Sequence, residues 1–195
     1  MAPRSEEDFK TIRDNRKAAI LEAAMELFAE NGFQGASMSL LAKKAGISKG
    51  LAYNYFSNKE QLVKEVIHHG LMKMFASFSL PEGVFTEADM DNLINQNFDL
   101  LDESPRYWQL YFSVIMQPKI MKMAIESIMQ IVMPMMGKFA GYFKDKGYKE
   151  FEKEAIFIGS LLDGISLNYL YNKEMYPRDY AIKRIKEIIN LKTEK

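Results

Sequence analysis

The feature that most constrains the fold of this chain is a pair of short helices joined by a tight turn, which the sequence predicts between Ser37 and Phe56. Ser37 is placed to cap the first helix, because its hydroxyl can accept a hydrogen bond from an N–H group of the first turn. Gly46 can end that helix at positive φ, and Ser48 can cap the next helix. The spacing therefore predicts a helix-turn-helix, in which two helices cross closely.

Each helix of this motif has an apolar side and a polar side. In the first helix the apolar residues follow the i, i+3, i+4, i+7 spacing of a core-facing stripe: Met38, Leu41, Ala42 and Ala45. In the second helix Ala52 and Phe56 are expected to point inward. Its other side carries groups at i, i+4 spacing that suit a helix reading the DNA major groove: Lys49, Gly50, Tyr53 and Asn54.

Charge supports this interpretation only locally. The 195 residues include 26 Lys and Arg and 26 Asp and Glu, so the formal net charge is zero. From Ala36 to Lys59, however, the charged residues are all lysines: Lys43, Lys44, Lys49 and Lys59. A locally basic motif is compatible with DNA binding, although a solvated helix face has the same composition.

The rest of the chain is also predicted to be helical, because apolar residues recur at helical spacing and strand-like alternation is nowhere sustained. Besides the two short helices, we expect helices at about 11–31, 57–78, 86–103, 105–118, 119–146, 149–172 and 177–191. The fourth helix begins with one of two capping boxes, Ser57 with Glu60 or Asn58 with Gln61. The sequence thus predicts an all-α fold of about nine helices. A DNA-binding domain is expected over residues 1–58 and a larger helical domain over residues 59–195.

The sequence gives no sign of export, of a membrane span or of a metal site. It contains no cysteine, its first eight residues are unlike a signal peptide, and no run approaches about 18 apolar residues. His68 and His69 are adjacent on a helix, where side chains point about 100° apart, so they cannot share a metal as an i, i+4 pair could. We expect a cytoplasmic protein without a metal or another cofactor.

Three stretches together resemble TetR-type transcriptional regulators. Residues 20–33 (ILEAAMELFAENGF) resemble their opening helix, and residues 41–50 (LAKKAGISKG) resemble their helix-turn-helix. Residues 53–56 (YNYF), followed by Lys59 and Glu60, resemble the end of their recognition helix and the start of their connecting helix. The detailed resemblance covers about residues 16–66, and residues 162–165 (LDGI) resemble a recurrent Asp-Gly element of the penultimate helix.

This resemblance implies a ligand-responsive regulator, most often a repressor, that binds a palindromic operator as a homodimer. Three N-terminal helices would bind double-stranded DNA, and the C-terminal domain would dimerise and enclose the pocket of a small-molecule effector. The resemblance places four residues at the bases: Lys49, Gly50, Tyr53 and Asn54. It places Ser37, Tyr55 and Lys59 at phosphates, and Ser48 at the cap of the recognition helix within the same surface.

Leu51 and Ala52 depart from the family pattern, which commonly has a small or polar residue at the first position and a large apolar one at the second. Ala52 leaves less volume between the two helices. Two interpretations of Leu51 stay open. It either fills part of that space or contacts a thymine methyl group.

A ligand site is expected among methionines and aromatic residues of the larger domain. Half of the 14 methionines fall within residues 116–136, and flexible thioethers beside aromatic rings can line an adaptable apolar cavity. Methionine at helical spacing is, however, more often plain core. Glu126, Gln130 and Asn168 either orient a ligand or lie in solvent. For a small apolar or amphipathic ligand, the expected residues are Trp108, Tyr111, Phe112, Met116, Met123, Glu126, Met133, Phe139 and Asn168.

The last two helices carry stripes that suit a homodimer. The penultimate helix has a stripe with small residues that permit close approach: Ala155, Ile158, Gly159, Leu162, Ile165, Ser166 and Tyr169. The final helix has Ile182, Ile185, Ile188 and Ile189. Two such helices from each subunit would form a four-helix bundle, and the alternative is that the same stripes form core within one chain.

Two other classes of function compete with a regulator. Residues 46–50 match the G-x-S-x-G elbow of serine hydrolases, but that motif needs a preceding strand, and none is predicted. We therefore expect that the protein is not an enzyme. The second alternative is a helical protein-interaction module that binds no DNA, from which steeply salt-dependent binding to duplex DNA would distinguish a regulator.

Overall fold

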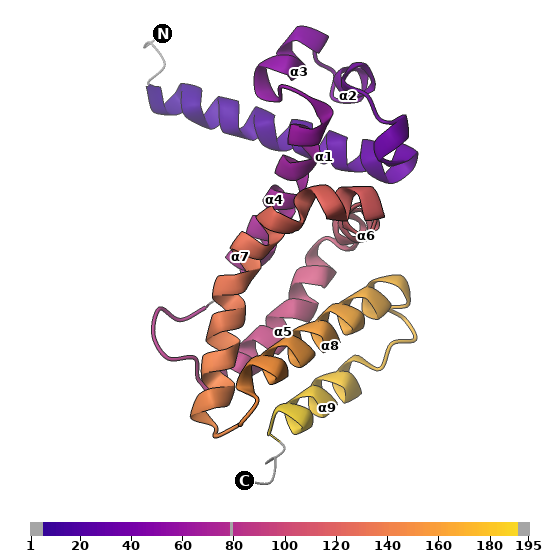
Figure 1. Ribbon diagram of the computed structural model, residues 1–195. Coiled ribbons are helices and arrows are strands. Elements are labelled where there is room, and N and C mark those ends of the chain that lie inside the picture. The colour runs from indigo at the N-terminus through magenta and orange to yellow at the C-terminus, as the bar shows by residue number, and fades with distance from the viewer. Residues whose placement is uncertain (1–5, 79, 191–195) are drawn as a thin grey trace. The chain divides into compact units, whose positions relative to one another are not determined.

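The computed structural model describes residues 6–78 and 80–190, and over these residues it contains nine α-helices and no strand (Figure 1). The predicted all-α fold is therefore confirmed. Residues 1–5 of the expected non-signal N-terminus, and Leu191 of the expected last helix, lie outside the described residues. The helices are α1 (Glu6–Gly35), α2 (Met38–Lys44), α3 (Lys49–Tyr55), α4 (Lys59–Ser77), α5 (Glu87–Glu103), α6 (Pro105–Ile115), α7 (Pro118–Asp145), α8 (Phe151–Tyr171) and α9 (Arg178–Asn190).

These helices form two compact units. Unit 1 consists of Met1–Gly70 and Leu110–Ser127, and unit 2 consists of Leu71–Gln109 and Ile128–Lys195. The unit boundaries fall inside α4, α6 and α7. The expected domain boundary between residues 58 and 59 lies within unit 1, at the start of α4. The assignment of separate functions to residues 1–58 and 59–195 stays a prediction.

Unit 1 is built on α1, which passes beneath α2 and α3 (Figure 1). Helical geometry breaks at Gly32, directly after the expected end of the first helix at about residue 31, with φ of 64° and ψ of 174°, and one further turn reaches Gly35. Apolar residues before the break, such as Ile20 and Phe28, are buried together with Phe56 at the end of α3. Because this face of α1 is buried, it provides the base on which the helix-turn-helix rests.

Gly70 permits α4 and α6 to approach closely within unit 1. A Cβ atom at this position would lie 2.1 Å from a ring carbon of Tyr111. The hydroxyl of Tyr111 donates a hydrogen bond of 3.2 Å to the carbonyl of Ile67. Tyr111 therefore joins α6 to α4 as a packing residue.

Unit 2 is organised around α5, α8 and α9, which lie side by side (Figure 1). The stripe that was expected to form a dimer surface is instead buried over most of its length. Ala155, Ile158 and Leu162 are buried, and Ser166 shares hydrogen bonds with Asn97 of α5. On α9, Ile185 and Ile189 are buried as well. These stripes belong to the interior of unit 2, because α5, α8 and α9 cover one another there.

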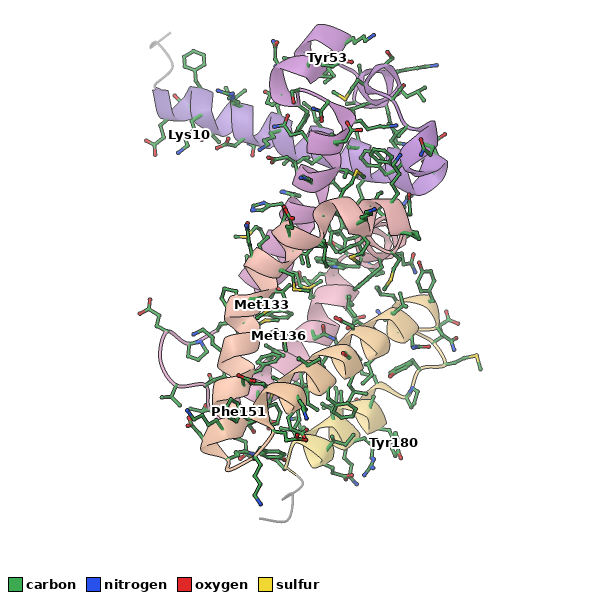
Figure 2. The ribbon with its side chains drawn as sticks, viewed as in Figure 1. Lys10, Tyr53, Met133, Met136, Phe151 and Tyr180 are labelled. Carbon is green, nitrogen blue, oxygen red and sulfur yellow. The ribbon has the colours of Figure 1, made fainter. Side chains whose placement is uncertain are left out.

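α7 is the one helix in the described parts of the chain that is long and apolar enough to cross a membrane by length and composition. Only 11% of its apolar window is buried, and Met133 is exposed on it (Figure 2). Lys122 and Glu126 interrupt its apolar sequence. Length and composition alone do not separate a membrane span from an apolar helix of a globular protein.

Candidate nucleic-acid interface

Both predicted caps of the helix-turn-helix are formed. The hydroxyl of Ser37 accepts a hydrogen bond of 3.2 Å from the N–H of Leu40, and that of Ser48 accepts one of 3.1 Å from the N–H of Leu51. Gly46 adopts φ 64° in the turn between the helices, a conformation that glycine adopts without steric cost. The hydroxyl of Ser48 thus caps a helix, and a helix rather than a strand precedes the G-x-S-x-G residues, so no nucleophile elbow is formed.

α3 presents a polar, exposed face. Ala52 and Phe56 are fully buried on its inner side. Tyr53 is 46% exposed and lies on the outer side of α3 (Figure 2). Lys49, Gly50 and Asn54, the other residues expected to contact bases, are exposed as well. The arrangement offers a cation, a phenol and an amide on one short helix, and such groups can form hydrogen bonds with base edges in a major groove.

Lys59 is engaged within the chain rather than exposed as a phosphate contact. Its ammonium donates hydrogen bonds of 2.6 Å to the carbonyl of Phe33 and of 2.9 Å to that of Ala36. It also lies 4.3 Å from the centroid of the Phe33 ring. Lys59 therefore links the start of α4 by hydrogen bonds to the segment that leads from α1 into α2. Tyr55, the other phosphate candidate of α3 and α4, is half-buried.

The start of α4 carries the second of the two predicted capping pairs, with one difference. Asn58 accepts a hydrogen bond of 2.8 Å from the N–H of Gln61. The side chain of Gln61 reaches back one residue further than a capping box requires, and its Oε1 accepts a bond of 2.7 Å from the N–H of Ser57. The side chains of Asn58 and Gln61 thus hold the entry into α4.

Gln117, between α6 and α7, is a residue of this region that sequence reasoning missed. Its Oε1 accepts a hydrogen bond of 3.1 Å from the N–H of Phe33, and its Nε2 donates one of 3.0 Å to the carbonyl of Phe28. These two backbone groups flank the break at Gly32, where regular helical bonding is interrupted. Lys119 adds a second ammonium 4.7 Å from the Phe33 ring. No local sequence signal could have found a partner 84 residues away.

The lysines of the basic stretch have two different roles. Lys44 pairs with Glu30 at 2.9 Å and with Glu26 at 3.1 Å, and hydrogen bonds to these carboxylates raise the pKa of Lys44. Lys43 and Lys49 are exposed, and among the described residues neither forms an ion pair. Two of the four lysines, Lys44 and Lys59, are therefore engaged in contacts within unit 1. The other two, Lys43 and Lys49, are available to a partner.

The expected ligand residues are divided between the two units. Unit 1 contains Tyr111, Phe112, Met116, Met123 and Glu126, and unit 2 contains Trp108, Met133, Phe139 and Asn168. Several are held by other contacts: Trp108 donates a bond of 3.0 Å to the carbonyl of Leu100, and Phe139 packs on Phe85 at 5.6 Å between ring centroids. Met116, Glu126, Met133 and Asn168 are exposed. Their role in ligand binding stays a prediction.

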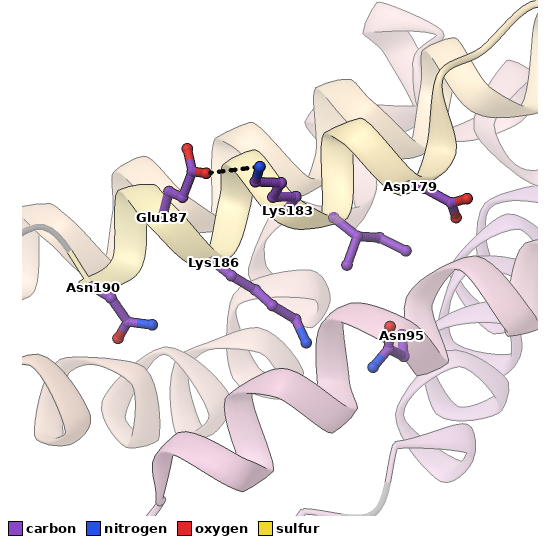
Figure 3. Close-up of a pocket in the computed structure, with 7 residues that line it drawn as sticks. Asn95, Asp179, Lys183, Lys186, Glu187 and Asn190 are labelled. Carbon is purple, nitrogen blue, oxygen red and sulfur yellow. Dashed lines mark ion pairs between the residues drawn. The ribbon is translucent and has the colours of Figure 1, made fainter.

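A groove of about 640 Å³ between α5 and α9 contains none of these residues (Figure 3). Both of its lysines are paired: Lys186 lies 3.1 Å from Asp91, and Lys183 lies 3.9 Å from Glu187. Ion pairs of this kind leave little net charge for recognition of a ligand. The groove is lined by Asn95, Asp179, Ile182, Lys183, Lys186, Glu187 and Asn190.

Comparison with known proteins matches the same part of the chain that carries the interface. Residues 20–66 match the family described as bacterial regulatory proteins, tetR family. The HTH-type transcriptional regulator UidR of Escherichia coli (strain K12) is 33% identical over 91 residues, which are 46% of this chain and 46% of that protein. The match thus spans about half the length of this curated relative.

Solved structures share the fold over most of the chain. A transcriptional regulator from Rhodococcus sp. Rha1 has a TM-score of 0.72 at 20% identity, covering 89% of this chain and 93% of that one. The transcriptional regulator FadR from Bacillus subtilis, solved in complex with stearoyl-CoA, has a TM-score of 0.65 at 20% identity, covering 91% of this chain and 99% of that one. These similarities support the observed helical architecture.

Proposed function

Because the chain belongs to the tetR family of bacterial regulatory proteins, we propose that it is a cytoplasmic, ligand-responsive transcriptional repressor that binds DNA as a homodimer. The exposed polar face of α3, held in a capped helix-turn-helix, carries this proposal. Lys49 is suited to donate to guanine, Asn54 to pair with adenine, and Tyr53 to bond a base or a phosphate. A two-fold dimer would place two such helices about 34–36 Å apart on a palindromic operator.

Selection of bound duplexes from a random pool tests the DNA-binding part. A palindromic consensus and steeply salt-dependent affinity are expected. In the selected site, Asn54→Ala should weaken binding by about 10- to 100-fold and relax preference at one base pair of each half-site. Lys64→Ala, an exposed change on α4, is the matched control and should leave that preference unchanged. If the wild-type protein showed no salt-dependent affinity for duplex DNA, the interaction-module alternative would replace this proposal.

The surface proposed for the dimer is the exposed side of α8. Ile156 is 63% exposed and Phe157 is 54% exposed, which is unusual for such large apolar side chains. Ser160 and Gly164 continue the same side one and two turns further on, and small residues permit a second helix to approach closely. We assign this side of α8, in place of its buried stripe, to contact with a second copy of the chain.

The oligomeric state tests this assignment. Phe157→Glu should convert a dimer to a monomer in sedimentation or light-scattering measurements, because a charge buried in the interface has no partner there. Val84→Glu is the matched control, since Val84 is also exposed but lies before α5. A wild-type monomer, or a Phe157→Glu protein that stays dimeric, would refute the assignment.

The proposed effector is a small apolar or amphipathic molecule that weakens operator binding. Two exposed methionines on α7, Met129 and Met133, support an apolar contact surface. Stearoyl-CoA is the probe of choice because FadR of Bacillus subtilis was solved with it. The probe should lower operator affinity by the ratio of its affinities for the two states of the protein, whereas coenzyme A alone should not. An unchanged affinity would reject an acyl-CoA effector.

A further inference from the structure

A groove of about 750 Å³ lies in unit 1 between the first half of α1 and the turn joining α2 to α3. Its lining combines apolar residues with three polar ones, Asn15 and Arg16 from α1 and Ser48 from the turn. The apolar residues include Leu51, which is half-buried here. The groove is lined by Ile12, Asn15, Arg16, Ala19, Ile20, Ala45, Gly46, Ile47, Ser48 and Leu51.

This groove adjoins the face of α3 proposed to read bases. In an α-helix, Leu51 lies about 60° around the axis from Asn54 and about 100° from Gly50. The groove is therefore the edge of the recognition face that turns toward α1. Leu51 lines the groove at this edge and is half-buried, and both interpretations of its role stay predictions.

The groove has positive charge on one wall, where Arg16 lines it and Arg13 lies about one turn earlier on α1, outside the lining. Arg13 and Arg16 lie about one turn apart on the exposed first half of α1, and among the described residues neither forms an ion pair. The opposite wall belongs to the stretch from Ala36 to Lys59, which contains no acidic residue. Asp14, on the same helix, points about 160° away from Arg16. An unpaired guanidinium beside an acid-free wall favours an anion.

We propose that this groove holds the sugar–phosphate backbone of one operator strand, with Arg16 and Arg13 bound to phosphates that flank the bases read by α3. The guanidinium fork matches the geometry of a phosphate, and the apolar residues of the lining can contact the sugars of the strand. Contacts to phosphates fix the register of a protein on DNA without reading sequence. The inference rests on the DNA binding proposed above and adds a segment of α1 to that surface.

The salt dependence of DNA affinity tests this inference. For the double variant Arg13→Gln/Arg16→Gln, the slope of log K against log salt concentration should become shallower by about 0.9 per phosphate contact, or about 1.8 in all. The base preference in the selected operator should stay unchanged. Ala19→Phe should weaken binding without a change of charge, because a ring at this exposed position obstructs the groove. Since all three positions are exposed, the temperature of unfolding should stay within a few degrees of that of the wild type.

A charge-matched double variant, Lys64→Gln/Lys122→Gln, is the control. Both lysines are exposed in unit 1, and neither lines the groove. An unchanged slope in the arginine variant, or an equal change in the lysine control, would overturn the inference. A changed base preference would also overturn it, since the arginines would then read bases. Failure of the proposed function is distinguishable, because the wild-type protein itself would then show no salt-dependent DNA binding. That result would also remove this inference.

Discussion

α3 and α8 differ in how many of their sides are apolar. In α3 the buried side holds Ala52 and Phe56, and the exposed side is polar. In α8 large apolar side chains lie on both sides: Ile158 is fully buried, while the adjacent Phe157 is 54% exposed. The inward side of α3 follows from its own residues, whereas that of α8 is decided by which side α5 and α9 cover.

The two regions also differ in where their polar contacts originate. The caps of α2 and α3 come from Ser37 and Ser48. Each hydroxyl accepts a hydrogen bond from the N–H group three residues further along the chain. In unit 2 the end of α8 is tied to α5, because the hydroxyl of Tyr169 donates a bond of 2.8 Å to the carboxylate of Asp102. Local contacts make a helix predictable, and distant contacts decide how it packs.

The largest expected effect separates the two sides of α8. Ile158→Ala should lower the free energy of unfolding by about 2–5 kcal/mol, because it leaves a cavity in the core. Phe157→Ala, at the next position, should change it by less than about 1 kcal/mol in the monomer, because the ring is largely exposed. Chemical denaturation measures both, at a protein concentration low enough to populate monomers. Equal losses at the two positions would show that α8 has no distinct buried side.

The next largest effect is a loss of stability in alkaline solution, which tests the distant contact between Tyr169 and Asp102. Burial, followed by the hydrogen bond to Asp102, raises the pKa of Tyr169 to about 12. The unfolded chain loses this proton near pH 10, so the folded state binds more protons between about pH 10 and 12 and stability falls as pH rises through that window. About 2–3 kcal/mol should be lost through this residue by pH 12. Denaturation at several pH values should show a smaller loss for Tyr169→Phe; identical pH profiles would contradict the shift.

Gln117→Leu tests a distant contact within unit 1. It should lower the free energy of unfolding by about 1–3 kcal/mol, because the N–H of Phe33 and the carbonyl of Phe28 lose their partner. Gln109→Leu in unit 2 is the matched control, since its side chain donates one bond of 2.7 Å to the carbonyl of Leu170. Denaturation should show the smaller loss for the control. If Gln117→Leu were as stable as the wild type, the local caps alone would suffice to hold this region.

The smallest effect concerns the local caps themselves. Ser48→Ala should cost about 1 kcal/mol, because the N–H of Leu51 loses its acceptor at the start of α3. Ser39→Ala, an exposed change on α2, should be nearly neutral. Thermal unfolding of the two variants provides the measurement, and a neutral Ser48→Ala would mean that water replaces the cap without cost.

The all-α fold and the helix-turn-helix could be predicted because their signals act over three or four residues. Ser37, Gly46 and Ser48 mark helix ends by capping and by positive φ, and these interactions need no partner from elsewhere in the chain. The break at Gly32 is predictable for the same reason. The ligand residues are a different case, since methionines and aromatic rings serve as core or as pocket with the same sequence pattern.

By itself, the sequence determined where the capped helices α2 and α3 begin and which side of α3 is polar, because helical hydrogen bonds, caps and period all lie within one turn. Only the tertiary structure decided which side of α8 is buried, that Lys59 turns to the carbonyls of Phe33 and Ala36, and that Gln117 closes the break in α1. The physical reason is that burial and hydrogen-bond partners depend on chain segments brought together by folding. In the helix-turn-helix, the sequence alone determined the polar side of α3, and folding placed a groove beside it.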